Sequence, residues 1–220
     1  SSADAIYDFQ DGTDLIGLAS LAFDDLTIAQ GSGNYSNHVL VSITSSSEYL
    51  AVIQTMSASN VTALDFVNTS TDAQTVNGTT GNDILIGGSG IDTFNTNTGV
   101  DTIYGHGGND IINITGTGSK VIDGGAGTDT VVVDYSGISN LGDFVVSMSG
   151  DYTVLTYSNS DTIQFKNVEN LTVDSYAYTR DTDAKTYWNA SEYKLYLYDG
   201  ASVSSSDIKA LGSFAAATNL

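Results

Sequence analysis

Between residues 78 and 132 one large apolar residue recurs near the end of almost every block of nine residues, with polar and glycine positions between. The recurring residues are Leu85, Phe94, Ile103, Ile112, Val121 and Val131. Successive side chains of a strand point to opposite faces. The pattern therefore predicts a short strand at the end of each block, with the recurring residue pointing into a core and its two neighbours pointing outward.

Glycines and aspartates also occupy fixed places in these blocks, which span 78–86, 87–95, 96–104, 105–113, a degenerate 114–122, and 124–132. Residues 78 to 127 hold 14 of the 23 glycines, and every block except the degenerate one has an aspartate at its sixth place. This spacing matches G-G-x-G-x-D-x-U-x, where U is a large apolar residue, which is typical of the calcium-binding parallel β-roll. We predict an all-β fold built around a right-handed parallel β-roll, a solenoid of nonapeptides stacked on calcium.

The residue types in the turns fit calcium chemistry. Glycine accepts positive φ, so it permits a tight turn whose carbonyls point inward together. Calcium takes six to eight hard oxygen ligands, which carbonyls and carboxylates supply. The predicted ligands are Thr79, Gly81, Asp83, Gly88, Gly90, Asp92, Asn97, Gly99, Asp101, His106, Gly108, Asp110, Asp123, Gly125, Gly127 and Asp129. His106 is expected to contribute its carbonyl and not its ring.

Two blocks form one coil, so turns on the same side are eighteen residues apart. Calcium is expected between Asp83 and Asp101 on one side, and between Asp92 and Asp110 on the other. Beyond Asp101 the expected aspartate is replaced by Ser119 and Lys120, which predicts a weak or absent site. The next interval, from Asp110 to Asp129, contains one extra residue, and Asp123 is a candidate helper there. The pattern thus predicts three sites, the third depending on that extra residue.

Two other interpretations of the segment remain open. One is a flexible linker rich in Gly, Ser and Asn, although a linker has no reason to keep an apolar residue in every block. The other is a metal-free β-helix whose aspartates form polar ladders. Stacked carboxylates without a cation repel one another, which disfavours this second alternative.

The charge of the chain supports a cation requirement. The formal net charge is −20, and residues 1 to 119 carry thirteen acidic residues and neither Lys nor Arg. That half cannot neutralise itself, so we expect it to need bound cations. A nucleic-acid partner is excluded, because a polyanion would be repelled. The absence of cysteine excludes disulfides and thiolate chemistry, and no apolar run is long enough for a membrane span.

The flanks are predicted to be β-rich. Residues 1–67 form one module, residues 68–77 a linker into the roll of residues 78–134, and residues 135–220 a capping region. The predicted strands are 26–28, 39–43, 49–53, 144–148, 152–157, 162–165 and 193–198, and residues 205–220 are expected to include a short helix. The acidic segment 8–14 is either a further calcium loop or a solvated turn. The tyrosines of 193–198 favour sheet packing over sugar stacking.

No catalytic motif is present, so we predict that the chain is not an enzyme. The two histidines, His38 and His106, are not part of an H-E-x-x-H motif. A G-x-S-x-G nucleophile elbow is also absent. Carboxylates in calcium turns account for the abundant aspartates more simply than a glycosidase pair does.

The nonamers at 78–113 and 124–132 resemble the repeats-in-toxin (RTX) family of secreted bacterial proteins. The segments Asp8–Ile16, Phe23–Leu26 and Leu64–Phe66 resemble a module that follows such repeats, while Asp129–Ser136 and Phe165–Leu171 resemble segments that close a block. The resemblance implies export by a type I secretion system through an uncleaved signal in the C-terminal tail, and folding in extracellular calcium. Since the chain opens with Ser1 and has no signal peptide, we expect it to be part of a longer protein.

Three functions follow as hypotheses. The first is a non-enzymatic, calcium-dependent folding and secretion module of a larger exported protein, with calcium and the secretion machinery as partners. The second is self-assembly of a bacterial surface layer or adhesin, with other copies of the chain or a cell-surface polysaccharide as partner. The third is a module of a polysaccharide-active enzyme. All three imply an extracellular or cell-surface location.

Overall fold

The structure, a computed structural model, describes residues 3–19, 21–157, 160–181, 186–189 and 194–197, and side chains as far as Tyr178. These residues form β-strands and short 3-10 turns, with no α-helix among them. The chain divides into two compact units, Ser1–Ser70 and Thr71–Leu220. The predicted all-β class is confirmed.

The N-terminal unit is a small β module. Its strands are β1 (Asp4–Ile6), β2 (Ile16–Leu18), β3 (Leu26–Gln30), β4 (Val39–Ile43), β5 (Tyr49–Ile53) and β6 (Phe66–Asn68), with 3-10 turns η1 (Phe23–Asp25), η2 (Gly33–Tyr35), η3 (Ala58–Asn60) and η4 (Ala63–Asp65). One sheet has the order β1-β5-β4-β3, and β2 pairs with β6 in parallel. The strands predicted at 26–28, 39–43 and 49–53 are confirmed.

The acidic segment of this unit closes on itself as a turn. The Asp14 carboxylate accepts from the Gln10 backbone N–H at 2.9 Å, and Asp14 N–H donates to the Gln10 carbonyl. Asp65, which is 1% exposed, accepts from Gly12 and from the backbone N–H of Thr62. These contacts account for the turn through hydrogen bonds, and a calcium loop at residues 8–14 stays a prediction.

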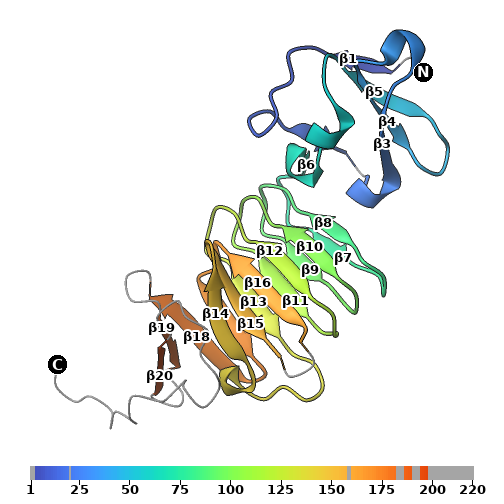
Figure 1. The fold of residues 1–220 in the computed structure, drawn as a ribbon. Helices are drawn as coiled ribbons and strands as arrows, with labels where there is room; N and C mark the ends of the chain where they lie inside the picture. The colour runs from blue at the N-terminus through green and yellow to red at the C-terminus, as the bar shows by residue number, and fades with distance from the viewer. Residues whose placement is uncertain (1–2, 20, 158–159, 182–185, 190–193, 198–220) are drawn as a thin grey trace. The chain divides into compact units, whose positions relative to one another are not determined.

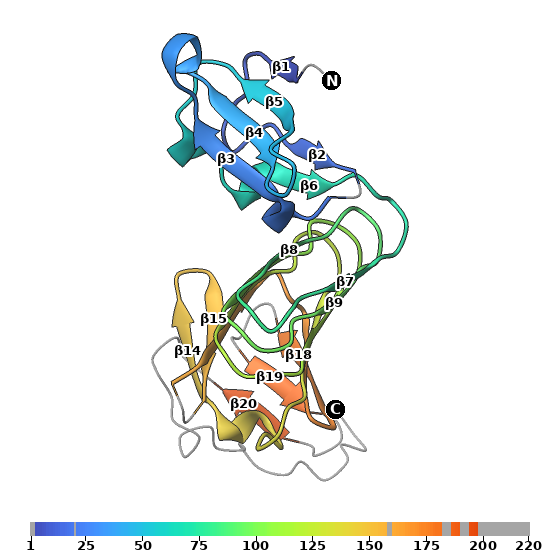
Figure 2. The same ribbon diagram turned by 90° about the vertical axis from the view of Figure 1, so that its right-hand side faces the viewer.

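The second unit is built around two parallel stacks of short strands (Figures 1 and 2). One stack contains β8 (Ile84–Ile86), β10 (Asp101–Tyr104), β12 (Lys120–Asp123) and β16 (Thr162–Lys166); the other contains β7 (Thr75–Asn77), β9 (Thr93–Asn95), β11 (Ile111–Ile114), β13 (Thr130–Val133) and β17 (Asn170–Val173). The chain alternates between the stacks, so each pair of strands makes one coil of a parallel β-roll.

The recurring apolar residues fill the space between the stacks. Leu85, Ile103, Ile122 and Phe165 are in register on one side, and Val76, Phe94, Ile112, Val131 and Leu171 on the other. All except Val76, which packs against the cluster, are buried. Burying each such side chain contributes about 1.5–3 kcal/mol, so the predicted core positions also carry much of the packing energy.

The prediction that Val121 is a core residue is wrong. Val121 pairs with Thr102 and is half-buried, whereas Ile122 pairs with Ile103 and is fully buried. The extra residue of the fifth block lies earlier than the spacing suggested, at the end of β11. There Ile114 is buried and pairs with Val133. All later positions are therefore displaced by one residue, and the repeat resumes nineteen residues from its counterpart.

The parallel coil extends beyond both of its predicted boundaries. Residues 75–77, assigned above to the linker, form β7 because Val76 takes the core position eighteen residues before Phe94. At the other end β16 and β17 continue the two stacks although the nonapeptide spacing has ended. Their register depends on apolar residues such as Phe165 and Leu171 and not on glycine spacing.

Antiparallel strands cover the end of the roll. The hairpin of β14 (Val145–Ser149) and β15 (Tyr152–Thr156) pairs with β16. On the other sheet β17 is followed by β18 (Tyr176–Asp181), β19 (Thr186–Asn189) and β20 (Lys194–Leu197). An unpaired strand edge invites association, so these strands protect the final coil. β20 confirms the central part of the strand predicted at 193–198; the helix expected within 205–220 lies outside the described residues.

Candidate metal centre

Two rows of turn residues run along the roll, one position ahead of the core strands or at their first residue. The Asp83 row consists of Asp83, Asp101 and Lys120, and the Asp92 row of Gln74, Asp92, Asp110, Asp129 and Glu169. Each member of a row comes from a different coil, and the coil of β16 adds no member to the Asp83 row. The rows therefore bring together carboxylates that are eighteen or more residues apart in the chain.

In both rows a carboxylate oxygen accepts a hydrogen bond from the backbone N–H of the preceding row member, and the residues that accept in this way are Asp92, Asp101, Asp110, Asp129 and Glu169. Asp83 N–H donates to Asp101 Oδ1 at 3.1 Å, and Asp92 N–H donates to Asp110 Oδ1 at 2.8 Å. Asp110 N–H reaches Asp129 Oδ1 at 2.7 Å, so the nineteen-residue interval is accommodated without loss of the contact. The repeated bond aligns the carboxylates along each row and leaves their second oxygens for another partner.

The second carboxylate oxygen of two members of the Asp92 row has no hydrogen-bond partner among the described residues. Asp110 Oδ2 and Asp129 Oδ2 are buried, and within the described residues neither accepts a hydrogen bond. Asp92 differs, because its Oδ2 accepts from Gly88 N–H at 2.8 Å. A buried carboxylate oxygen without a partner is costly. A cation at Asp110 and Asp129 would remove that cost.

Carbonyl oxygens of the adjacent turns converge on the same points. A Cβ placed on Gly87 would lie 2.7 Å from both Asp92 Oδ2 and the Gly105 carbonyl. On Gly105 it would lie 2.5 Å from Asp110 Oδ2 and would collide with the Gly124 carbonyl. At these two junctions between consecutive coils, a carboxylate oxygen and a carbonyl therefore lie close together, beside a glycine whose place a larger residue could not take. Hard oxygens of both kinds with net negative charge fit Ca²⁺.

Burial alters the protonation of these carboxyls. It raises the pKa of Asp110 to about 7, with the neighbouring carboxylates of Asp129 and Asp92 adding to the effect and a backbone hydrogen bond opposing it. Burial likewise raises the pKa of Asp101 and of Asp129. Desolvation disfavours the charged form, so without a cation these groups resist ionisation. A divalent cation would reverse that preference.

The candidate calcium sites cannot be recognised from clusters of acidic side chains alone. Within the described residues no group of three or more His, Cys, Asp or Glu side chains is placed to hold a metal ion. The roll contributes one carboxylate per turn, and so most of the ligands must be backbone carbonyls. That donor set suits calcium, which accepts carbonyl oxygens readily.

The comparison with known families agrees with this geometry. The family described as "RTX calcium-binding nonapeptide repeat (4 copies)" matches residues 70–90, 77–112 and 114–134. The matched part of the roll consists of RTX calcium-binding nonapeptide repeats. These repeats bind Ca²⁺, so the second unit is a calcium-binding module, and proteins that carry RTX repeats are typically secreted. The RTX match begins at residue 70, which agrees with a roll that starts inside the expected linker.

Among the curated proteins no relative matches this chain. Within the described residues, no helix has the length and apolar character that crossing a membrane requires.

The expected ligands of the Asp83 row lie together at the turns. Thr79 donates through its backbone N–H and its hydroxyl to Asp83, and the Thr79 hydroxyl accepts from Gly81 N–H. Asn97 and Gly99 both adopt positive φ, and Asn97 Nδ2 donates to the Gly78 carbonyl. These contacts shape the first turns of the roll.

The expected ligands of the Asp92 row are also brought together, with the exception of Asp123. The Gly88 N–H donates to the Asp92 carboxylate. Gly108 adopts positive φ and lies so close to the Gly90 carbonyl that no Cβ would fit there, so this position requires glycine. Gly125 and Gly127 also adopt positive φ in the turn that precedes Asp129.

His106 and Asp123 make other contacts. The His106 carbonyl accepts from Ala126 N–H at 2.7 Å, and so it joins two turns of the Asp92 row. Asp123 lies on β12, where Lys166 is 3.0 Å away and Asn167 donates to it. Asp123 is therefore part of a side-chain pair between two strands and is not brought to the turn, so the structure does not support its expected role.

Three row members were not predicted. Gln74 takes the aspartate position of the first coil, its N–H donating to Asp92 Oδ1 at 2.9 Å. Glu169 closes the Asp92 row by accepting from Asp129 N–H at 2.8 Å. Lys120 ends the described Asp83 row, in register with Asp101. Counting back nine residues from Asp83 would have found Gln74, whereas the irregular spacing hides Glu169 and Lys120.

Proposed function

We propose that this chain is a non-enzymatic module of a larger exported protein, which folds when it meets extracellular calcium and thereby supports type I secretion. Calcium would hold the coils of the roll together through Asp83 and Asp101 in one row, and Asp92, Asp110 and Asp129 in the other. Binding to the folded state alone shifts the folding equilibrium by mass action. At low calcium the roll would remain unfolded, which would suit the chain to export.

The observation that carries the proposal is the pair of buried carboxylate oxygens without partners, Asp110 Oδ2 and Asp129 Oδ2. A metal-free roll must accept this cost at the centre of its longer row. The formal net charge of −20 adds self-repulsion. Both effects oppose folding in the absence of cations, and bound calcium reduces both.

Circular dichroism during a calcium titration from chelator tests the folding step. We expect a rise of β signal with calcium and little response to magnesium, which prefers octahedral sites with bound water. The variant D110N should need at least about tenfold more calcium. D151N, which makes the same change at an exposed hairpin residue, serves as the matched control. A full β signal already present in chelator would refute calcium-triggered folding.

Export itself requires a cellular test. Expressed with a type I exporter, the full chain should appear outside the cell, and deletion of residues 205–220 should abolish its export. D110N should still be exported, because this variant changes folding and leaves the tail intact. Export that is unaffected by the deletion would contradict the proposed secretion role.

A second function, calcium-dependent self-assembly in a surface layer or adhesin, is favoured by a separate observation in the N-terminal unit. Tyr35 and Tyr49, 52% and 53% exposed, line an open hollow of about 570 Å³ together with Leu40 and Val52. Exposed aromatic residues beside a hollow are common at protein interfaces. Sedimentation at rising protein concentration in saturating calcium distinguishes the functions, since a strictly monomeric chain would exclude assembly.

A further inference from the structure

Lys120 is fully buried, which is rare for a lysine. It is the first residue of β12, and its register partner in the Asp83 row is Asp101. The residue type expected at this place in a calcium-binding nonamer is aspartate. A cationic side chain therefore stands where the repeat would place an anionic ligand.

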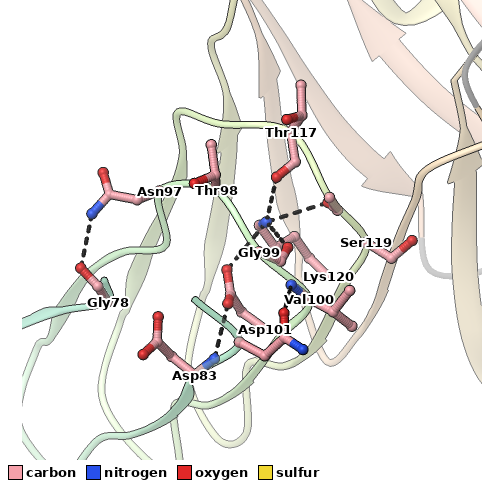
Figure 3. Close-up of polar contacts among 12 residues, drawn as sticks. Gly78, Asp83, Asn97, Thr98, Gly99, Val100, Asp101, Thr117, Ser119 and Lys120 are labelled. Carbon is pink, nitrogen blue, oxygen red and sulfur yellow. Dashed lines mark hydrogen bonds and ion pairs between the residues drawn. The ribbon is translucent and has the colours of Figure 1, made fainter. Parts of the chain in front are cut away.

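The Lys120 ammonium is surrounded by oxygen atoms (Figure 3). Its Nζ lies 2.6 Å from the Gly99 carbonyl, 3.2 Å from the carbonyls of Thr117 and Gly118, and 3.1 Å from Asp101 Oδ2. The carbonyl of Gly99 and the carboxylate of Asp101 belong to one turn, and the other two carbonyls belong to the next turn. The nitrogen thus bridges two consecutive coils.

This oxygen set has the composition of a calcium site. At the junctions of the Asp92 row, a carboxylate oxygen lies close to a carbonyl of the next turn, and within the described residues Asp110 Oδ2 and Asp129 Oδ2 accept no hydrogen bond. At the Lys120 junction the corresponding oxygen, Asp101 Oδ2, also accepts no hydrogen bond, but it forms an ion pair with Lys120 Nζ at 3.1 Å. Where the Asp92 row requires an external cation, the Asp83 row has a covalently attached one.

Further hydrogen bonds close the same junction. Gly99 N–H donates to the Thr117 carbonyl and Asp101 N–H to the Ser119 carbonyl, both at 3.1 Å. Gly118 N–H donates to Asp161 Oδ2 at 2.9 Å. The turn is thus held on both sides around the ammonium, and displacing Nζ would expose four oxygens to one another.

We propose that Lys120 Nζ permanently occupies a cation position of the roll, as an internal substitute for calcium between the turns of residues 96–101 and 115–120. Calcium is excluded from this junction, and the described Asp83 row takes calcium only between Asp83 and Asp101. The lysine also provides the roll with one junction whose closure is independent of the calcium concentration. Replacing Lys120 by aspartate restores the ligand type of the repeat and converts the junction into a calcium site.

Isothermal titration calorimetry of K120D tests the conversion. We expect the variant to bind one more calcium ion per chain than the wild type, because Asp101, residue 120 and the freed carbonyls then form a site. S149D, which adds a carboxylate at an exposed strand end outside the rows, should leave the stoichiometry unchanged. A folded K120D with the wild-type stoichiometry would overturn the proposal.

A second measurement needs no variant. The calcium-saturated wild-type chain is treated with an amine-acetylating reagent, and labelling is followed by mass spectrometry. Lys120 should react at least about 100-fold more slowly than Lys166, whose side chain is 31% exposed, since its reaction requires local opening of the roll. Equal rates would show that calcium has expelled the ammonium, which contradicts the proposal. Both tests examine the junction directly, so their outcome does not depend on whether folding is triggered by calcium.

Discussion

At the scale of single residues, the side chain at the sixth place of each turn decides how a junction of the roll is neutralised. Asp110 and Asp129 leave a buried oxygen without a partner, Asp101 is paired with Lys120, and Gln74 adds no charge at the first coil. The backbone contact along the row is the same in the Asp and Gln cases. The difference between junctions is therefore electrostatic and not a difference of fold.

Removing the Lys120 ammonium should destabilise the roll strongly. K120M leaves the Asp101 carboxylate buried without its partner, which typically costs about 3–5 kcal/mol. K166M breaks a partly exposed pair with Asp123 and should cost only about 0–1 kcal/mol. Urea unfolding in saturating calcium measures both. Equal losses of unfolding free energy in the two variants would show that the buried Lys120 pair stabilises the roll no more than the partly exposed Lys166 pair.

The raised pKa of Asp110 predicts that acid partly replaces calcium. The folded, metal-free chain keeps a proton on Asp110 up to about pH 7, whereas the unfolded chain loses it near the ordinary value of 3.8. The folded state thus binds more protons between these values, and its stability falls as pH rises through that window. In calcium-free buffer, the β signal in circular dichroism should therefore be larger at pH 5 than at pH 8. A smaller difference is expected for D110N, and an equal β signal at both pH values in the wild type would contradict the assignment.

At the scale of elements, the register of the strands is set by apolar side chains where the nonapeptide spacing fails. β11 absorbs the extra residue through the buried Ile114, and β12 then presents Ile122 to the core in place of Val121. β16 and β17 stack on the roll through Phe165 and Leu171. Core packing accordingly continues the coil after glycine and aspartate have ceased to repeat.

Alanine substitutions should reveal this register. I122A removes a fully buried side chain and should cost about 2–5 kcal/mol. V121A, one residue away and half-buried, should cost about 1 kcal/mol or less. Thermal unfolding of the two variants in the same calcium concentration provides the comparison. The opposite ranking would place Val121 in the core and return the extra residue to a later position.

At the scale of the whole chain, the two compact units differ in how their buried carboxylates are satisfied. The unit Ser1–Ser70 has its own core around Val39, Ile53 and Phe66. Its buried carboxylate, Asp65, is satisfied by hydrogen bonds, in contrast to Asp110. The cost of a missing cation is thus concentrated in the roll.

Hydrogen exchange should separate the two units. When calcium is added to the chain in chelator, amides within 75–133 should become protected, whereas those of β4 and β5 should change little. Amides of both units are measured in one sample, so each serves as the reference for the other. Equal protection of both units by calcium would show that the N-terminal unit also depends on the metal.

The sequence by itself determined the parallel coil and its chemistry. The nine-residue period, the glycines that tolerate positive φ and the aspartates at one place in each turn are local features, and together they admit few structures other than a calcium-binding roll. They also placed the core residues from Leu85 to Ile112 correctly. Local spacing was enough wherever the repeat was regular.

Only the tertiary structure decided where the extra residue lies, which side chains end the rows, and where the roll begins and ends. Lys120 meets Asp101 and Glu169 meets Asp129 because coils nineteen and forty residues apart stack in register. Such contacts depend on which apolar side chains share the core, and no spacing within one block encodes that choice. The cation at the Asp101 junction is consequently Lys120, a residue that the nonapeptide pattern alone would have marked only as a missing aspartate.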